Sequence, residues 1–132
     1  MNRRKLVAGL AILAAPALIA ASQALPRALQ QAQPGLWEIS DPSGDRRTQR
    51  ICFRDLSAMA QVEHRGRQCT RVTIKDDPRL AQIHYTCVGG GFGRATLEPV
   101  TPRNFRLVTQ GIDGGLPFHH TLAARRVGNC SN

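Results

Sequence analysis

The feature that most constrains the fold of this 132-residue chain is a set of four cysteines, Cys52, Cys69, Cys87 and Cys130. An even number of cysteines in so small a chain favours disulfides, because the chain buries little apolar surface and gains from cross-links. Zinc binding is the alternative, with His64 or His84 as further ligands. Zinc sites usually bring ligands roughly two to four positions apart, whereas the closest cysteines here are separated by seventeen positions. We therefore expect two disulfides and no metal site.

Residues 1–24 have the pattern of a signal peptide. Residues 2–5 carry three positive charges, residues 6–21 form an uncharged and mostly apolar run, and Ser22 and Ala24 offer small side chains at the two positions that a signal peptidase reads. A membrane anchor is the alternative, but the sixteen residues of the apolar run fall short of the ~20 that span a bilayer. We therefore expect export to the periplasm or out of the cell, where disulfides form.

The remaining residues, 25–132, have the length of one domain. Residues 25–34 are rich in Pro, Ala and Gln and predict a flexible leader, followed by a single β domain over 35–132. The chain carries 18 basic and 9 acidic residues, a net charge of +9. The arginines are scattered and not gathered into a run. This charge predicts a general attraction to anionic surfaces, including peripheral contact with an anionic membrane, and not nucleic-acid binding.

Short runs with a period of two, each bounded by Gly, Pro or Asp, predict about seven strands. They cover residues 35–39, 47–53, 70–75, 80–87, 92–98, 104–110 and 117–126. In the first run Trp37 and Ile39 share one face, and the first two runs form a hairpin. Strands of this length and spacing indicate a mostly β fold, either an antiparallel β-sandwich or a lipocalin-like barrel.

A single short helix is predicted over residues 55–62. Asp55 can accept hydrogen bonds from the free amides of its first turn, and Gly66 ends it. Its buried stripe should consist of Leu56, Met59 and Ala60.

Four cysteines allow three pairings. Cys69 and Cys87 lie symmetrically about Pro78, so a hairpin places them opposite each other, and Cys52 then pairs with Cys130. That register also places two apolar side chains opposite polar ones, Val72 opposite His84 and Ile74 opposite Gln82. A slip by one residue would align the apolar faces but separate the cysteines, whereas a β-bulge would reconcile the two requirements.

Taken together, several of these features resemble an exported proteobacterial family, domain of unknown function 3617. The shared elements are the opening Gly35-Leu36-Trp37-Glu38, Cys52 before a short helix with Asp55, the Cys69 and Cys87 pair, and the ending 125–130. The resemblance covers residues 34–130 and implies an exported four-cysteine β domain with no established activity. The chain differs from the family in its short first hairpin loop, which lacks a methionine-rich turn.

The Gly-x-Trp opening is also similar to the first strand of lipocalin-like barrels, in which a late arginine packs over the tryptophan. We expect Trp37 to anchor the core, with Arg125 or Arg126 covering it by a cation–π contact. These three side chains are the candidates for lining a ligand site.

Other motifs that could carry chemistry have simpler structural explanations. The glycine-rich stretch 89–94 continues into a strand and not a helix, so it predicts a turn and not a phosphate loop. His119 and His120 are adjacent in a strand and face opposite sides. The remaining candidates are the turn residues Asp76-Asp77 and Asp113-Gly114-Gly115, and four serines without a nucleophile context, Ser40, Ser43, Ser57 and Ser131.

These observations favour a protein without catalytic residues or cofactors. We expect a monomeric periplasmic binding module for a small apolar or anionic ligand. The alternative is an envelope interaction or structural protein that uses a basic surface.

Overall fold

A computed structural model describes residues 23–131, so the signal peptide predicted over 1–24 lies outside the described residues except for Gln23 and Ala24. The described chain contains two 3₁₀ helices and seven strands. Their bounds are η1 Arg27–Leu29, β1 Gly35–Ser40, β2 Gln49–Phe53, η2 Leu56–His64, β3 Cys69–Asp77, β4 Leu80–Cys87, β5 Phe92–Thr101, β6 Asn104–Asp113 and β7 Leu116–Gly128.

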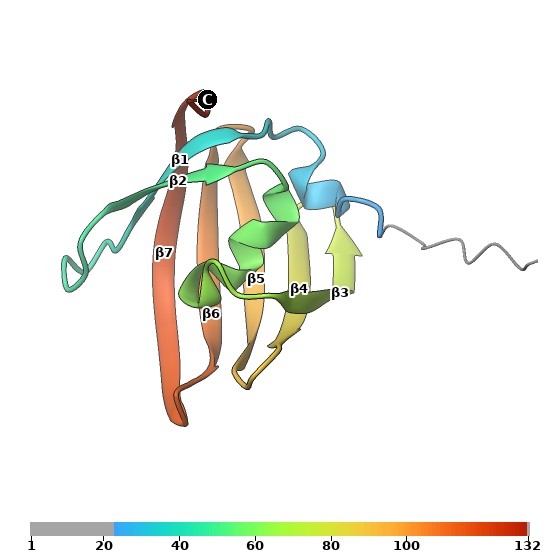
Figure 1. Cartoon of the computed structure of the whole chain (residues 1–132). Coiled ribbons are helices and arrows are strands. Elements are labelled where there is room, and N and C mark those ends of the chain that lie inside the picture. Colours follow the sequence, from blue (N-terminus) through green and yellow to red (C-terminus); the bar gives the residue numbers. More distant parts are fainter. Residues whose placement is uncertain (1–22, 132) are drawn as a thin grey trace, which may run out of the picture.

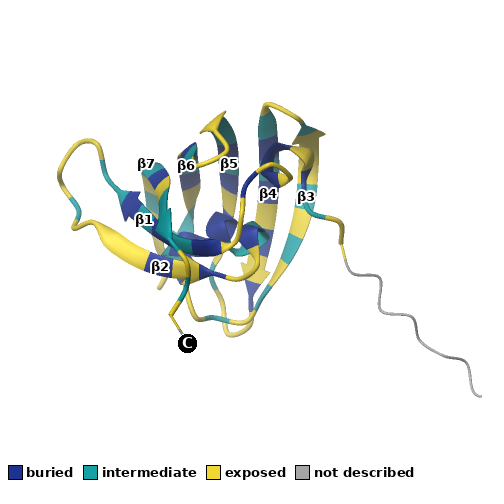
Figure 2. Cartoon of the chain, turned by 90° about the horizontal axis from the view of Figure 1, so that it is seen from above, coloured by how far each residue is buried: buried dark blue, intermediate teal, exposed yellow. Residues whose placement is uncertain are grey.

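All seven strands belong to one antiparallel sheet, in the order β2-β1-β7-β6-β5-β4-β3 (Figure 1). This confirms the predicted mostly β fold of about seven strands. The pairing of β1 with β7 brings the two ends of the domain together. The sheet does not close into a barrel, because β2 and β3 remain as its two edges. Seen from above, the sheet curves around η2, whose residues are largely buried (Figure 2).

The core lies on the concave face of the sheet, between the strands and the two helices. The predicted alternation in the first strand is confirmed, since Trp37 and Ile39 are buried and Glu38 points to the other face. The side chains that fill the centre come from both layers: Leu29, Trp37, Met59, Leu97 and Leu107 are each fully buried. The filled concave face therefore makes the sheet and helices one packed unit.

Helix η2 matches the predicted helix closely at its start. The Asp55 carboxylate accepts a hydrogen bond from the Ser57 amide at 2.9 Å, as expected of a residue that caps a first turn. The backbone departs from helical angles at Gln61, and Gly66 follows the helix with a φ of +78°. The predicted stripe is confirmed, because Leu56, Met59 and Ala60 are all buried.

The segment 25–34 differs from the flexible leader that its composition predicts. It forms η1, in which Leu29 is fully buried, and Ala32 also joins the core. The Arg27 amide donates to Asp76 Oδ1 at 2.7 Å, and the Arg27 guanidinium donates to the Asp76 carbonyl oxygen at 2.7 Å. Burial of apolar side chains, reinforced by these two bonds, holds the segment against the end of β3.

Both predicted disulfides are present, Cys69 with Cys87 and Cys52 with Cys130. Such bonds are consistent with an extracellular or periplasmic protein. The second links β2 to the residues after β7 and so joins one edge of the sheet to the C-terminus. No helix within residues 23–131 is long and apolar enough to cross a bilayer.

The register of the β3–β4 hairpin explains the conflict seen in the sequence. Val72 lies opposite His84 as predicted, but Gln82 pairs with Lys75 and not with Ile74, because the register shifts between Thr73 and Lys75. This irregularity corresponds to the β-bulge that the sequence analysis gave as one of two possible registers. It does not bring the apolar faces together, since Val72 and Ile74 remain about half exposed, at 47% and 48%.

Candidate functional site

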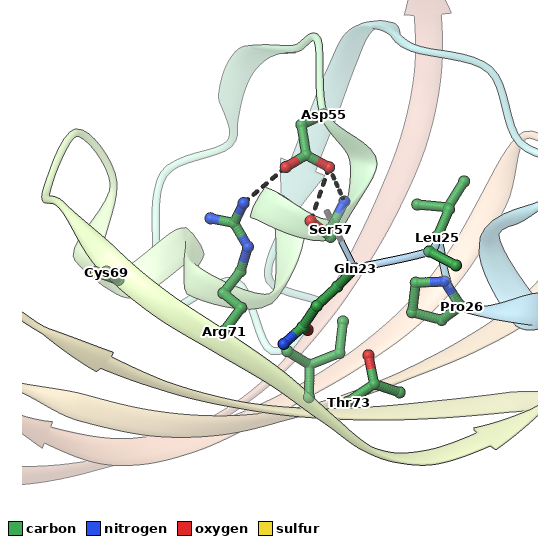
Figure 3. Close-up of a pocket in the computed structure, with 10 residues that line it drawn as sticks. Gln23, Leu25, Pro26, Asp55, Ser57, Cys69, Arg71 and Thr73 are labelled. Atoms are coloured by element: carbon green, nitrogen blue, oxygen red, sulfur yellow. Dashed lines mark hydrogen bonds and ion pairs between the residues drawn. The ribbon is translucent and has the colours of Figure 1, made fainter. Parts of the chain in front are cut away.

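An open groove of about 430 Å³ lies between β3, the start of η2 and the N-terminal segment (Figure 3). Its walls come from segments that are distant in the sequence. The lining residues are Gln23, Ala24, Leu25, Pro26, Asp55, Ser57, Cys69, Arg71, Thr73 and Ile83.

The polar side of the groove is organised around Arg71, which projects from β3. One terminal nitrogen donates to Asp55 Oδ2 and the other to Gln61 Oε1, each at 2.6 Å. Asp55 Oδ1 in turn accepts from the amide and hydroxyl of Ser57 at 2.9 and 2.7 Å. Because a guanidinium has about five N–H donors and these contacts use two, Arg71 is held in place with donors to spare.

The other side of the groove is apolar. Ile83, which is almost fully buried, lies beside Leu25 and Pro26 from the N-terminal segment. The groove therefore combines a fixed hydrogen-bonding group with an apolar wall, the combination that orients small molecules with a polar head and an apolar body.

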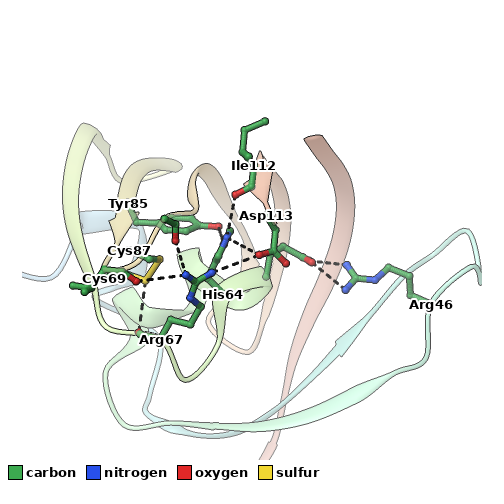
Figure 4. A network of polar contacts seen from close by, with 11 residues as sticks. Arg46, His64, Arg67, Cys69, Tyr85, Cys87, Ile112 and Asp113 are labelled. Carbon is green, nitrogen blue, oxygen red and sulfur yellow. Dashed lines mark hydrogen bonds and ion pairs between the residues drawn. A yellow bond between two sulfur atoms is a disulfide. The ribbon is translucent and has the colours of Figure 1, made fainter. Parts of the chain in front are cut away.

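A second polar cluster, the His64 network, lies near the ends of β4 and β6 (Figure 4). His64 is almost fully buried; its Nδ1 lies 2.9 Å from the Tyr85 hydroxyl, and its Nε2 lies 3.1 Å from the Ile112 carbonyl oxygen. Asp113 Oδ1 is 3.5 Å from His64 Nε2 and 3.5 Å from Arg67 Nη1. Arg67 also donates to the Gly90 carbonyl oxygen at 2.6 Å.

The hydrogen positions in this network follow from its acceptors. The Ile112 carbonyl can only accept, so His64 Nε2 carries a hydrogen, and in the neutral ring Nδ1 accepts from the Tyr85 hydroxyl. Burial raises the pKa of Tyr85 to about 12, and the negative charges of Glu63 and Asp113 act in the same direction. Tyr85 therefore keeps its proton, and the buried His64 acts as a structural link between strands.

Gln61 connects the groove to the His64 network. Its amide nitrogen donates to the Arg67 carbonyl oxygen at 3.1 Å, while its amide oxygen accepts from Arg71. Gln61 therefore links the Arg71 side chain to the loop that precedes β3.

The three side chains predicted to line a site do not meet there. Trp37 is fully buried, packs edge-on against Phe105 with ring centroids 5.8 Å apart, and donates to the Gln33 carbonyl oxygen at 3.3 Å. Arg126 binds the Pro34 carbonyl oxygen and Asn129 instead of covering the indole. None of the aromatic contacts among residues 23–131 involves either arginine. The burial of Trp37 and its contact with Phe105 support the expected role of this side chain in the core.

Arg125 lies on the opposite, convex face of the sheet. It donates to Glu38 Oε1 at 3.0 Å, and Arg50 binds the other oxygen of the same carboxylate at 3.4 Å. The hydrogen bond from Arg125 is the main cause that lowers the pKa of Glu38; burial opposes it, and the hydrogen bond from Arg50 lowers the pKa further. Arg125 also lines a shallow groove of about 500 Å³ on that face.

The remaining sequence motifs have the structural roles expected of them. Residues 89–91 all have positive φ, between +83° and +100°, so they form a glycine turn. His119 is exposed, whereas His120 stacks on Phe118 on the other face of β7. Within the described residues, no three His, Cys, Asp or Glu side chains are grouped so as to hold a metal ion.

Sequence reasoning did not predict that these residues form two polar clusters, although it considered Asp55, His64 and Asp113 for other roles. Arg71 lies 16 positions from Asp55, and His64 lies 21 positions from Tyr85 and 48 from Ile112. One signal was available for Arg71: it occupies an inward position of β3, where an apolar residue is expected. His64 was considered only as a possible zinc ligand, and no local sequence signal indicates its contacts with Tyr85 and Ile112.

Comparison of the chain with protein-family models, with curated proteins and with solved structures gives no match. The resemblance to the domain of unknown function 3617 family therefore stays a prediction.

Proposed function

We propose that this chain is an exported, non-catalytic binding module whose ligand occupies the groove between β3 and η2. The ligand would be a small molecule with an apolar body and an anionic head. The observation that carries this proposal is the position of Arg71, fixed by Asp55 and Gln61 at the rim of a groove of about 430 Å³ with an apolar wall.

The electrostatics of the groove favour a single acidic head group over a highly charged one. Asp55 already compensates one positive charge, so the pair with Arg71 is close to neutral. A carboxylate or sulfonate can use the free N–H donors of the guanidinium without displacing Asp55. The apolar body of the ligand would pack against Leu25, a partly exposed apolar side chain that lines the same groove.

Removal of the predicted signal peptide would make the groove more favourable for an anion. Gln23 and Ala24, which line it here, belong to the predicted leader. Cleavage after Ala24 would take both residues away and leave the positively charged amino group of Leu25 at the rim. Processing would thus enlarge the site and add a second cation to it.

The proposal is tested with 1-anilinonaphthalene-8-sulfonate, a dye with an apolar body and one sulfonate. Protein recovered from the export compartment should bind the dye saturably, with about one molecule per chain. Thr73→Trp places a large side chain in the groove and should abolish binding. Arg71→Met keeps the length of the stem without the charge and should weaken binding by about tenfold, the loss of one charge-assisted contact.

Arg79→Met provides the matched control, because Arg79 is exposed in the turn after β3 and lies outside the groove. It should leave dye binding unchanged. Near-ultraviolet circular dichroism checks that each variant keeps a packed core, since the dye also binds partly unfolded chains. Equal dye binding by folded Thr73→Trp and the parent protein would refute the proposal. Native mass spectrometry of the parent protein should also show a retained small molecule.

A further inference from the structure

Two hairpin turns at one end of the sheet each expose an apolar side chain. The β4–β5 turn exposes Val88 and the β6–β7 turn exposes Leu116, both 71% accessible. Phe92, at the start of β5, is 47% exposed and lies in register with Ile112 of β6. Both turns lie at the same end of four adjacent strands, β4 to β7, which is the lower end in Figure 1. Neighbouring strands are about 5 Å apart, so the two turns are close to each other. We call Val88, Phe92 and Leu116 the tip residues.

The His64 network holds these two turns in fixed positions (Figure 4). Arg67 connects them, because it donates to the Gly90 carbonyl oxygen in one turn and pairs with Asp113 beside the other. The Val88 amide donates to the Gln68 carbonyl oxygen at 2.9 Å, and the disulfide at Cys87 ties the same turn to β3. These bonds hold the two turns in place, so the tip residues remain exposed to solvent.

Three arginines lie in the segments that adjoin the tip residues. Arg65 and Arg67 lie in the loop before β3, and Arg94 follows Phe92 on the same face of β5. Asp113 is the single acidic residue within segments 65–68, 88–94 and 113–117, and it pairs with Arg67. No ion pair among the described residues involves Arg65 or Arg94. Both arginines are exposed and free to bind an anion.

We propose that this end of the sheet docks on an anionic lipid bilayer. Val88 and Leu116 enter the boundary between head groups and acyl chains, and Arg65 and Arg94 contact lipid phosphates. Apolar side chains on hairpin turns, with two unpaired arginines in the adjoining segments, are complementary to a soft anionic surface. A protein partner of ordinary size would need roughly 1,000 Å² of matched surface, which two turns do not offer. This docking surface is separate from the groove beside β3 and does not depend on the function proposed for it.

The test is co-sedimentation of the disulfide-bonded protein with vesicles. The parent protein should sediment with phosphatidylglycerol vesicles and remain in solution with phosphatidylcholine vesicles. Val88→Ser combined with Leu116→Ser should weaken binding by at least about tenfold, because both inserting side chains are lost. Arg65→Gln combined with Arg94→Gln should weaken binding to a similar extent and reduce its dependence on salt.

Matched controls lie at the other end of the sheet. Val100 is 72% exposed near the β5–β6 turn, and Arg79 is exposed in the β3–β4 turn. Val100→Ser combined with Arg79→Gln should bind vesicles like the parent. All variants share one N-terminus, so any contribution of the leader cancels. Equal losses in the control and tip variants would overturn the proposal. A parent protein that fails to sediment with phosphatidylglycerol vesicles would also overturn the proposal. If that parent instead carried a co-purifying protein that the tip variant lost, this end of the sheet would be assigned to a protein partner.

Discussion

The His64 network depends on residues that have no side chain at all. A Cβ atom at Gly91 would lie 2.6 Å from His64 Nε2, and one at Gly93 would lie 2.5 Å from the Tyr85 hydroxyl oxygen. Both distances are shorter than real carbon contacts, so these two glycines provide the space that the imidazole and the phenol occupy. Gly91 also has a φ of +91°, a conformation that other residues rarely adopt. The glycine-rich stretch therefore has two roles: it allows the backbone of the turn to adopt positive φ, and it leaves space for the buried side chain of His64.

Tyr85 should titrate at unusually high pH. Burial raises its pKa from the ordinary value near 10 to about 12. Between these values the folded chain holds the proton that the unfolded chain has lost. The free energy of unfolding should therefore be unaffected by this group below about pH 10 and should fall by up to about 1.4 kcal/mol per pH unit between pH 10 and 12.

Because Tyr85 is the only tyrosine in the chain, its ionisation can be followed directly by absorbance. Tyr85→Phe should remove the alkaline loss of stability. At neutral pH it should cost about 1–3 kcal/mol, because His64 Nδ1 loses its partner. A titration midpoint near that of a free tyrosine would contradict the buried network.

Trp37 should behave as the main core anchor. Trp37→Ala removes a fully buried side chain that contacts Phe105, and it should lower the free energy of unfolding by about 3–5 kcal/mol. Denaturant unfolding measures this loss, and Trp37→Phe, which keeps most of the apolar surface, should lose much less. A loss below about 1 kcal/mol would mean that the indole contributes little to the core.

How much of the residue-level structure could be predicted depends on sequence separation. The inward position of Trp37 follows from local alternation, and the capping role of Asp55 follows from its position before the helix. The second role of Asp55, its pair with Arg71, could not be predicted, because β3 approaches the helix only after the sheet has curved. The same holds for His64, which meets Tyr85 and Ile112 across the fold.

Among the elements, the β3–β4 hairpin shows that a disulfide and the pattern of apolar side chains can favour different registers. Cys69 and Cys87 lie directly opposite each other, and this register leaves Val72 and Ile74 on the outer face. The sequence could predict the pairing from the symmetry about Pro78, but not where the irregularity would fall. The irregularity falls between Thr73 and Lys75, just before Asp76, which the N-terminal segment binds from outside the hairpin.

The two disulfides should contribute unequally to stability. In the chain-entropy description, the loop of 78 residues between Cys52 and Cys130 and the loop of 18 between Cys69 and Cys87 correspond to about 4.5 and about 3 kcal/mol. Replacing each pair by serines and measuring unfolding in denaturant separates the two contributions. A larger loss for the shorter loop would show that native contacts around Cys69 and Cys87 outweigh loop entropy.

At the scale of the whole molecule, curvature creates both the core and the groove. The sheet bends around η2, so that β2 and β4, five places apart in the strand order, both contact the same buried helix (Figure 2). The sequence could predict the strands, the helix and the disulfides from local patterns. It could not predict an open curved sheet instead of a closed barrel, because closure depends on whether β2 and β3 meet. The groove beside β3 lies at one of these open edges.

One continuous core predicts one cooperative unfolding transition. Trp37 on β1 and Tyr85 on β4 report on distant parts of the sheet, and each is the single residue of its type. Urea unfolding followed by tryptophan fluorescence and by tyrosine absorbance should give the same midpoint. Met59→Ala, at a fully buried position of η2, should lower both midpoints equally and cost about 2–5 kcal/mol. If Met59→Ala lowered the fluorescence midpoint alone, the strands near β1 and those near β4 would be separate units, and η2 would not be the element that joins them.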